Sequence, residues 1–410
     1  MRLIHTSDWH LGRSFHQVGL LDAQARFVDH LVETVRSERV DAVLVSGDVY
    51  DRALPSPPTV SLLSEAVTRI IDVGAQVVLS SGNHDSAIRL GFASQLLSRT
   101  GLHIRTAVAE IGAPVVVEGV AVYGLPYLEP STCAEPLGAS ERTHAAVLRA
   151  AMDRVEADLA HRGAPSVVMA HAFVTGGASS ATVDASATSD SERDISVGGV
   201  SAVHPDVFAA ADYVALGHLH GAQRVSDRVR YSGSPVAMSF SEHRHTKGSW
   251  LVEVEDDGAV GVRAEFVEAP VERPLRVLRG DLEDLLADPE LTSASAAYCQ
   301  VTLTDALRPL GAMDRLRQRF PHTLVLAFDP QGAVTPISSY AAAFGRRTDD
   351  LDVCCDFLAH VRGGSPAATA ERGLFARAIE ASRTERAQRL DELGAVLPGL
   401  GDDVFRVGVA

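Results

Sequence analysis

The stretch Val40-Asp-Ala-Val-Leu-Val-Ser-Gly-Asp48-Val-Tyr-Asp51 is the part of the chain that decides the fold. Residues Ala42–Val45 are apolar, mostly β-branched and too few for a helix, which predicts a buried strand. Gly47 then lets the backbone turn sharply and present Asp48 above the end of that strand. A carboxylate in this place can bridge two cations, because each of its oxygens can bind a different ion. A Gly-Asp pair of this kind does not identify a metal site by itself.

Other predicted strands also end in residues that bind metals. Asp8 and His10 follow strand Arg2–Thr6, Gly82-Asn83-His84-Asp85 follows Gln76–Leu79, His171 follows Ser166–Ala170, and Gly217-His218-Leu-His220 follows Tyr213–Leu216. Side chains two residues apart in an extended segment point to the same side, which pairs the ligands at the first and last of these ends. In isolation, a D-x-H pair is more often a capping Asp beside a surface His, and a lone strand-end His can equally be a core residue.

Collected, the candidate metal ligands are Asp8, His10, Asp48, Asn83, His171, His218 and His220. Mixed imidazole and carboxylate ligands favour manganese, iron or zinc over magnesium, which prefers oxygen ligands. Seven ligands with one bridging carboxylate predict two ions about 3.5–4 Å apart, the spacing of two-metal phosphoryl-transfer sites. His84 lies beside a ligand without being needed as one.

The composition is that of a globular protein with room for two or three domains. The chain has 410 residues, of which 46% are hydrophobic and 22% charged, and its four cysteines show no metal-binding spacing. No apolar run reaches the roughly 18 residues of a membrane span, so we expect a cytoplasmic protein without membrane contact. The net charge of −16 argues against a protein that coats nucleic acid by bulk electrostatics. It does not exclude a nucleic-acid enzyme, because bound divalent cations invert the local field.

Pattern changes along the chain predict three regions, 1–267, 275–330 and 337–395. The first contains a long loop at Thr175–Gly199, rich in small and polar residues. The second has the strand–helix–strand–helix–strand pattern of a small α/β domain. The third has two amphipathic helices with little core left to cover, which indicates a partner-binding tail; packing back onto the body is the alternative.

The motifs D-x-H, G-D, G-N-H-D, a single H and G-H-x-H, in this order, resemble the calcineurin-like metallophosphoesterase superfamily. Within it, Thr6–Gly12, Asp190–Arg193, Gly217–His220 and Tyr231–Pro235 are similar to the nuclease subunits of bacterial SbcC–SbcD complexes. The resemblance implies an α/β fold, with a metallophosphoesterase β-sandwich flanked by helices. It also implies a small α/β DNA-capping domain and C-terminal helices.

The resemblance further implies the roles of the site residues. One metal would be held by Asp8, His10, Asp48 and His220, and the other by Asp48, Asn83, His171 and His218. His84 would be the catalytic histidine that steadies the scissile phosphate or protonates the leaving oxygen. The two divalent ions would be Mn²⁺.

The function implied is a two-metal DNA nuclease, a double-strand exonuclease and a single-strand and hairpin endonuclease, active in DNA repair and recombination. The chain has no Gly-x-x-x-x-Gly-Lys-Ser/Thr motif, so ATP dependence would come from an SbcC-type ATPase, in a heterotetramer of two SbcC and two SbcD subunits. A small-molecule phosphodiesterase, for example one acting on cyclic nucleotides, and a metal-free interaction scaffold are the alternatives.

A homodimer is also expected from the resemblance. Val60, Leu63, Val67 and Ile70 form an apolar helix face, and Leu90, Phe92, Ala93 and Leu97 could add to it. Such a face could pair across a two-fold axis. The alternative is that it packs on the sheet of its own chain.

Overall fold

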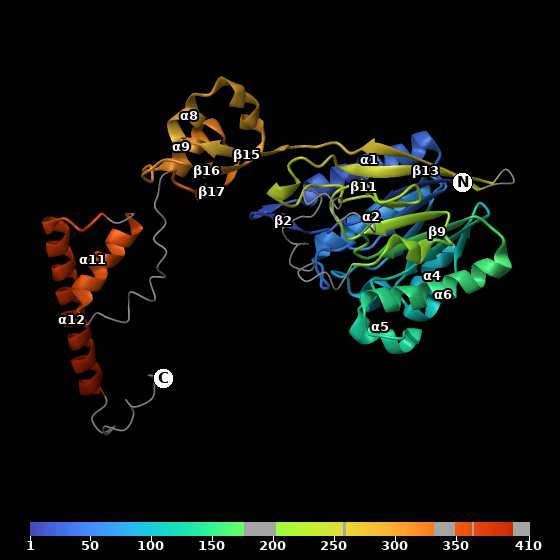
Figure 1. Ribbon diagram of the computed structural model, residues 1–410, viewed down its shortest axis with the longest axis horizontal. Coiled ribbons are helices and arrows are strands. Elements are labelled where there is room, and N and C mark those ends of the chain that lie inside the picture. The colour runs from blue at the N-terminus through green and yellow to red at the C-terminus, as the bar shows by residue number, and fades with distance from the viewer. Residues whose placement is uncertain (176–201, 257–259, 332–348, 363–364, 397–410) are drawn as a thin grey trace. The chain divides into compact units, whose positions relative to one another are not determined.

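The computed structural model describes residues 1–175, 202–256, 260–331, 349–362 and 365–396 (Figure 1). The chain divides into two compact units, one made of residues 1–278, 287–301 and 313–326, the other of 279–286, 302–312 and 327–410. The loop predicted at Thr175–Gly199 and the motif Asp190–Arg193 lie outside the described residues, apart from Thr175. The three regions predicted from the sequence stay predictions, and residues 337–348 of the third also lie outside the described part.

Two six-stranded sheets form the body of the first unit. The order in the first sheet is β14 (Val260–Glu268), β13 (Gly248–Asp256), β1 (Arg2–Thr6), β4 (Ala42–Ser46), β5 (Gln76–Ser80) and β6 (Leu102–Arg105). The order in the second is β11 (Gln223–Arg224), β12 (Val229–Tyr231), β10 (Tyr213–Gly217), β9 (Ser166–His171), β8 (Val120–Gly124) and β7 (Val115–Val117). Strands β1, β4, β5 and β6 run parallel, as do β8, β9, β10 and β12. Parallel strands end at one edge of a sheet, which gathers the residues that follow them.

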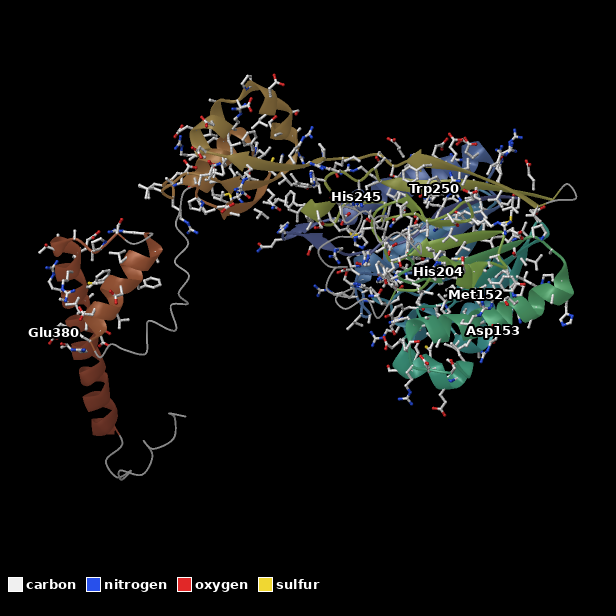
Figure 2. The ribbon with its side chains drawn as sticks, viewed as in Figure 1. Met152, Asp153, His204, His245, Trp250 and Glu380 are labelled. Carbon is white, nitrogen blue, oxygen red and sulfur yellow. The ribbon has the colours of Figure 1, made fainter. Side chains whose placement is uncertain are left out.

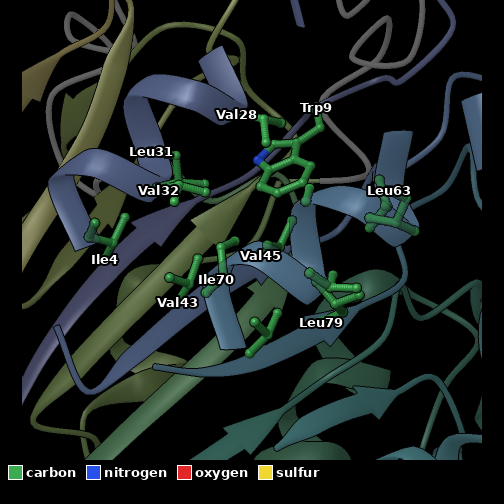
Figure 3. Close-up of a cluster of buried hydrophobic side chains, with 14 of the residues drawn as sticks. Ile4, Trp9, Val28, Leu31, Val32, Val43, Val45, Leu63, Ile70 and Leu79 are labelled. Carbon is green, nitrogen blue, oxygen red and sulfur yellow. The ribbon is translucent and has the colours of Figure 1, made fainter. Parts of the chain in front are cut away.

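The sheets are stacked between two layers of helices. Alternate residues of each strand face the other sheet, where Leu3, Leu44 and Met169 share one buried cluster. The outer face of the first sheet is covered by α1 (Leu21–Glu38) and α2 (Pro57–Asp72), as Figure 3 shows. The outer face of the second is covered by α5 (Pro130–Leu137) and α6 (His144–Arg162). Burial on both faces explains why the central strands are continuously apolar, and the predicted α/β sandwich flanked by helices is confirmed.

Shorter elements connect these layers. They are β2 (Ser14–Phe15), β3 (Val18–Gly19), α3 (Ala87–Leu90), α4 (Ser94–Leu97), and the 3₁₀ helices η1 (Ser98–Thr100), η2 (Val108–Glu110), η3 (Pro205–Phe208) and η4 (Phe240–Glu242). Within the described residues, no helix combines the length and the apolar character needed to cross a bilayer.

The C-terminal part contains a three-stranded sheet and a pair of helices. The sheet order is β15 (Leu275–Gly280), β16 (Tyr298–Leu303) and β17 (Thr323–Phe328), with helices α8 (Leu282–Ala287), η5 (Pro289–Ala296) and α9 (Ala312–Arg319) between the strands in sequence. This is the predicted strand–helix order. Helices α11 (Asp350–Val361) and α12 (Thr369–Val396) contact each other through ion pairs such as Arg372–Asp352, at 2.8 Å.

The apolar face of α2 belongs to the core. Leu63, Val67 and Ile70 are 8%, 8% and 0% exposed and pack on the first sheet, so the sheet-packing alternative holds for them. Val60 remains exposed. Helical spacing cannot separate a core-facing stripe from an interface stripe, because both place apolar residues three or four apart.

Candidate metal centre

The residues predicted as ligands lie together where β1, β4, β5, β9 and β10 end. Ligand atoms within 4.8 Å of one another form three groups, Asp8 with His10 and His220, Asp8 with Asp48 and His171, and His10 with Asp48 and His84. The other two predicted residues adjoin these groups. Asn83 Oδ1 lies 3.0 Å from His171 Nε2, and the His218 ring packs edge-on against His171. The structure thus assembles all eight predicted site residues, while their individual roles stay predictions.

The backbone of this site is strained. Asp8, His10, Asp48 and His218 have φ angles of 52°, 41°, 49° and 108°. Positive φ is uncommon for residues other than glycine, and each such residue costs on the order of 1–3 kcal/mol. Strain of this kind clusters where the surrounding structure enforces a functional geometry. Positive φ at four of the eight site residues indicates that the surrounding structure holds their side chains in place.

Hydrogen bonds between the strand-end loops impose these positions. The amides of Asp8 and His10 donate to the carbonyls of Gly47 and Asp48, at 3.1 and 2.9 Å. The His218 amide donates to the Asp8 carboxylate, with both oxygens at 3.1 Å. The His84 amide donates to Asp48 Oδ1 at 2.9 Å. Each carboxylate is therefore oriented by a neighbouring loop before any ligand binds.

Glycines allow the loops to approach this closely. A Cβ on Gly82 would lie 2.1 Å from Asp48 Oδ1, and one on Gly47 would lie 2.4 Å from His171 Nδ1. A Cβ on Gly217 would lie 1.9 Å from the Ser46 carbonyl oxygen. These distances leave no room for a side chain, so the glycines in G-D, G-N-H and G-H-x-H are required by close packing.

Gly82→Ala is expected to displace the Asp48 carboxylate and to weaken metal binding by about tenfold or more, the size of effect seen when support behind a metal ligand is removed. The matched control is Gly261→Ala, because a Cβ there meets nothing within 4 Å. Metal titration of both variants checks this, with circular dichroism to confirm folding. Unchanged metal affinity in folded Gly82→Ala would contradict the packing argument.

Asp48 and His171 form the electrostatic centre of the site. His171 Nδ1 donates to the Ser46 carbonyl at 2.9 Å, which directs Nε2 toward Asp48 Oδ2 at 3.3 Å. Burial raises the pKa of Asp48, but His171 and His10 outweigh it and hold that pKa well below its usual range. Burial lowers the pKa of His171, but Asp48 outweighs it and raises that pKa to about 9. A buried carboxylate here attracts a positive charge.

His10 and His220 show that the donor set fits a cation. Their Nε2 atoms lie 3.2 Å apart, and both rings are buried. Two neutral nitrogens whose lone pairs face each other repel unless a proton or a cation lies between them. Nδ1 of His10 is buried and has no hydrogen-bond partner among the described residues, so no hydrogen bond there fixes the tautomer. Together with the carboxylates of Asp8 and Asp48, these imidazoles suit divalent ions of the manganese, iron or zinc type.

His84 is held differently from the buried imidazoles. Its Nδ1 donates to the Asp51 carbonyl at 2.9 Å, its ring packs edge-on against His10, and the residue is partly exposed. The remaining nitrogen, Nε2, is therefore the one that could contact a substrate. The proximity of His84 to His10 and Asp48 also makes it geometrically able to bind metal, so only a variant separates the two roles.

Two carboxylates that sequence reasoning did not select support the ligands. Asp85 accepts from the amides of Val49, Tyr50 and Gly82 at 2.9–3.0 Å, and ties the loop after β4 to the loop after β5. Burial and the charge of Asp48 raise the pKa of Asp85 to about 6. Asp85 stands in the G-N-H-D motif, but its bonds to Val49 and Tyr50 span 36 and 35 residues, which local pattern does not reveal.

Asp51 is the second of these carboxylates. Its Oδ1 accepts from Arg13 at 2.8 Å and lies 3.6 Å from His10 Nδ1. Glu242 and Lys247, behind His220, were also missed. They come from a polar run after β12 that has no periodic pattern, so no signal in the sequence pointed to them.

Two family models match the chain. The model described as calcineurin-like phosphoesterase matches residues 1–222, more than half of the chain and all eight site residues. The model described as type 5 capsule protein repressor C-terminal domain, abbreviated SbcD_C, matches residues 271–361. The second match covers the small sheet and helix α11.

Two solved structures share a distant likeness with the chain. GAP50, described as the anchor in the inner membrane complex of Plasmodium, is 13% identical, with 66% of this chain and 84% of that chain covered and a TM-score of 0.39. The protein TT1561 of Thermus thermophilus is 12% identical, with 65% and 98% covered and a TM-score of 0.37. At TM-scores this low, the assignment rests on the family models. The chain belongs to the calcineurin-like phosphoesterase family of metal-dependent hydrolases, and its C-terminal part is of the SbcD type.

Proposed function

We propose that the protein is a two-metal DNA nuclease of the cytoplasm that acts with an SbcC-type ATPase in DNA repair and recombination. The observation that carries the proposal is the gathering of the candidate site residues, Asp48 among them, from five strand ends, in a chain that also has an SbcD-type C-terminal segment. The substrates proposed are double-strand ends for exonuclease action, and single strands and hairpins for endonuclease action. The C-terminal segment favours this function over a cyclic-nucleotide phosphodiesterase, and the complete ligand set favours it over a metal-free scaffold.

The proposed ligands divide into two sets that share Asp48. Asp8, His10 and His220 complete one set, and Asn83, His171 and His218 complete the other. The ions proposed are Mn²⁺; when bound, two such ions neutralise phosphate charge and supply an activated nucleophile. His84 donates a hydrogen bond from Nε2 to the scissile phosphate or a proton to the leaving oxygen, because its Nδ1 is already committed to the Asp51 carbonyl.

Nuclease assays test the proposal directly. Purified protein with Mn²⁺ is expected to cleave hairpin DNA and single strands, and addition of the partner ATPase with ATP is expected to increase cleavage of duplex ends. A cyclic nucleotide serves as the competing substrate. Cleavage of the cyclic nucleotide without any cleavage of DNA would contradict the proposed function.

Partner contacts are also proposed. Helices α11 and α12 carry exposed apolar side chains, among them Phe357 and Leu374, which suits binding to the ATPase in a complex of two ATPase and two nuclease subunits. A homodimer is proposed through the surface of α3 and α4, where Ile88, Phe92 and Leu96 are 89%, 80% and 64% exposed. Large apolar side chains gathered on one surface are typical of an interface.

Phe92→Glu is expected to give folded monomers that retain metal, because it replaces an exposed apolar side chain of the proposed interface with a charge. The matched control is Val116→Glu, since Val116 is also an exposed apolar residue but lies on β7. Analytical ultracentrifugation measures the outcome. A Phe92→Glu variant that remains as dimeric as wild type would place the interface elsewhere.

A further inference from the structure

A buried ion pair lies behind His220. Glu242 and Lys247 are 1% and 4% exposed, although charged side chains are rarely buried to this degree. Glu242 is the last residue of η4, and Lys247 directly precedes β13; Figure 2 labels His245, which lies between them, and Trp250, which lies on β13. Neither residue is part of a motif that marks the metal centre.

Every donor of the Lys247 ammonium is used. Its Nζ donates to Glu242 Oε2 at 2.5 Å, to the His220 carbonyl at 2.9 Å and to Ser234 Oγ at 2.9 Å. An ammonium group has three donors and no acceptor, so this cation is fully satisfied. Lys247 therefore links the Glu242 carboxylate to the backbone carbonyl of His220. The same carboxylate also contacts the His220 ring.

Glu242 accepts a hydrogen bond from the imidazole of His220. Oε1 lies 3.1 Å from His220 Nδ1, and Oε2 also accepts from the Met238 amide at 3.3 Å. Both Glu242 oxygens therefore face nitrogen atoms, with Lys247 Nζ and the Met238 amide at Oε2 and His220 Nδ1 at Oε1. When Nδ1 donates to Oε1, Nε2 of His220 presents its lone pair toward His10 Nε2.

A buried ion pair such as Glu242–Lys247 is not expected to add much net stability. Desolvating two charges often costs as much as their attraction returns, and apolar replacements of buried pairs are frequently neutral or stabilising. The other imidazoles have weaker partners. His171 Nδ1 donates to a neutral carbonyl, that of Ser46, and His10 Nδ1 lies 3.6 Å from Asp51. Among the proposed ligands with described contacts, His220 is the one whose ring lies within hydrogen-bond distance of a carboxylate outside the ligand set.

We propose that Glu242 is a positioning residue for the metal position formed by Asp8, His10, Asp48 and His220, and that Lys247 holds Glu242 in place. Glu242 fixes the ring orientation and tautomer of His220 and makes Nε2 a stronger donor to a cation. The inference rests on the ligand set of the proposed function. Removing a hydrogen-bond partner of a metal-binding histidine typically weakens metal binding about 10–100-fold. Here metal affinity should fall at only one of the two positions.

Calorimetric titration of metal-free protein with Mn²⁺ tests the proposal without any activity measurement. Glu242→Leu/Lys247→Met removes both charges and the acceptor, and is expected to weaken one binding event about 10–100-fold while leaving the other unchanged. Glu242→Gln/Lys247→Met restores a neutral acceptor for Nδ1 and is expected to recover part of that loss. Two unchanged binding events, or a glutamine variant as weak as the leucine variant, would overturn the positioning role.

Lys247→Met provides a second measurement if the leucine variant does not fold. It leaves Glu242 as a buried anion without its cation, so adding Mn²⁺ should raise the melting temperature by more than in wild type. An equal or smaller rise would overturn the proposal. His220→Ala distinguishes failure of the positioning role from failure of the ligand set. If His220→Ala loses one binding event while Glu242→Leu/Lys247→Met loses none, only the positioning role of Glu242 fails. If His220→Ala also keeps both binding events, the proposed ligand set itself is wrong.

Discussion

Asp48→Ala is expected to lose both metal ions and, with them, all detectable nuclease activity. Asp48 is shared by two of the three ligand groups, and its Oδ2 lies 3.3 Å from His171 Nε2 and 3.5 Å from His10 Nε2. A residue that binds only one ion should behave differently, so His10→Ala should weaken metal binding mainly at one of the two positions. Elemental analysis after dialysis, together with cleavage of hairpin DNA, measures both effects.

The control for this prediction is Asp29→Ala, which removes an exposed carboxylate on α1 that pairs with Arg69. It should keep both ions and wild-type activity. Asp48→Ala should remain folded. Without the Asp48 carboxylate the pKa of His171 should fall, so the buried His171 ring can become neutral and leaves no unpaired charge. Two retained ions in Asp48→Ala would rule out the shared role of this carboxylate.

His84→Ala is expected to keep both ions and to lose about 10²–10⁴-fold in cleavage rate, the usual contribution of a general acid–base group. The ring is partly exposed and its Nδ1 is held by the Asp51 carbonyl, which leaves Nε2 as the nitrogen that could act on a substrate. Metal titration and single-turnover cleavage must be measured on the same preparation. Exposed His204 supplies the control variant, His204→Ala, which should change neither quantity.

The outcomes for His84→Ala are distinct. Loss of an ion would make His84 a ligand, as its distance from His10 and Asp48 permits. Near wild-type cleavage with both ions present would remove it from the reaction. The proposed role therefore needs both results, retained metal and slow cleavage.

The clustering of the proposed ligands could be predicted from the sequence because each of them lies at or just after the end of a buried strand. Parallel strands bring their carboxyl ends to one edge, so Asp8, Asp48 and Asn83 had to meet once β1, β4 and β5 were placed in one sheet. His171 and His218 follow from the second sheet in the same way. The local sequence pattern was sufficient here because parallel pairing of the strands brings their carboxyl ends, and the residues that follow them, next to one another.

The supporting residues could not be predicted, because their partners are remote in the sequence. Glu242 contacts a ring 22 residues away, and Asp85 binds amides of another strand-end loop. The left-handed backbone of Asp8, His10 and Asp48 was equally hidden, since positive φ is uncommon outside glycine even for Asp and His. The face of α2 was ambiguous for a different reason, because core and interface stripes have the same period.

Anomalous diffraction at the manganese absorption edge, on crystals grown with Mn²⁺, tests the central claim most directly. We predict two peaks about 3.5–4 Å apart, one on each side of the Asp48 carboxylate, with His220 at one and His171 at the other. A single peak, or two peaks that do not share Asp48, would contradict the two-metal centre.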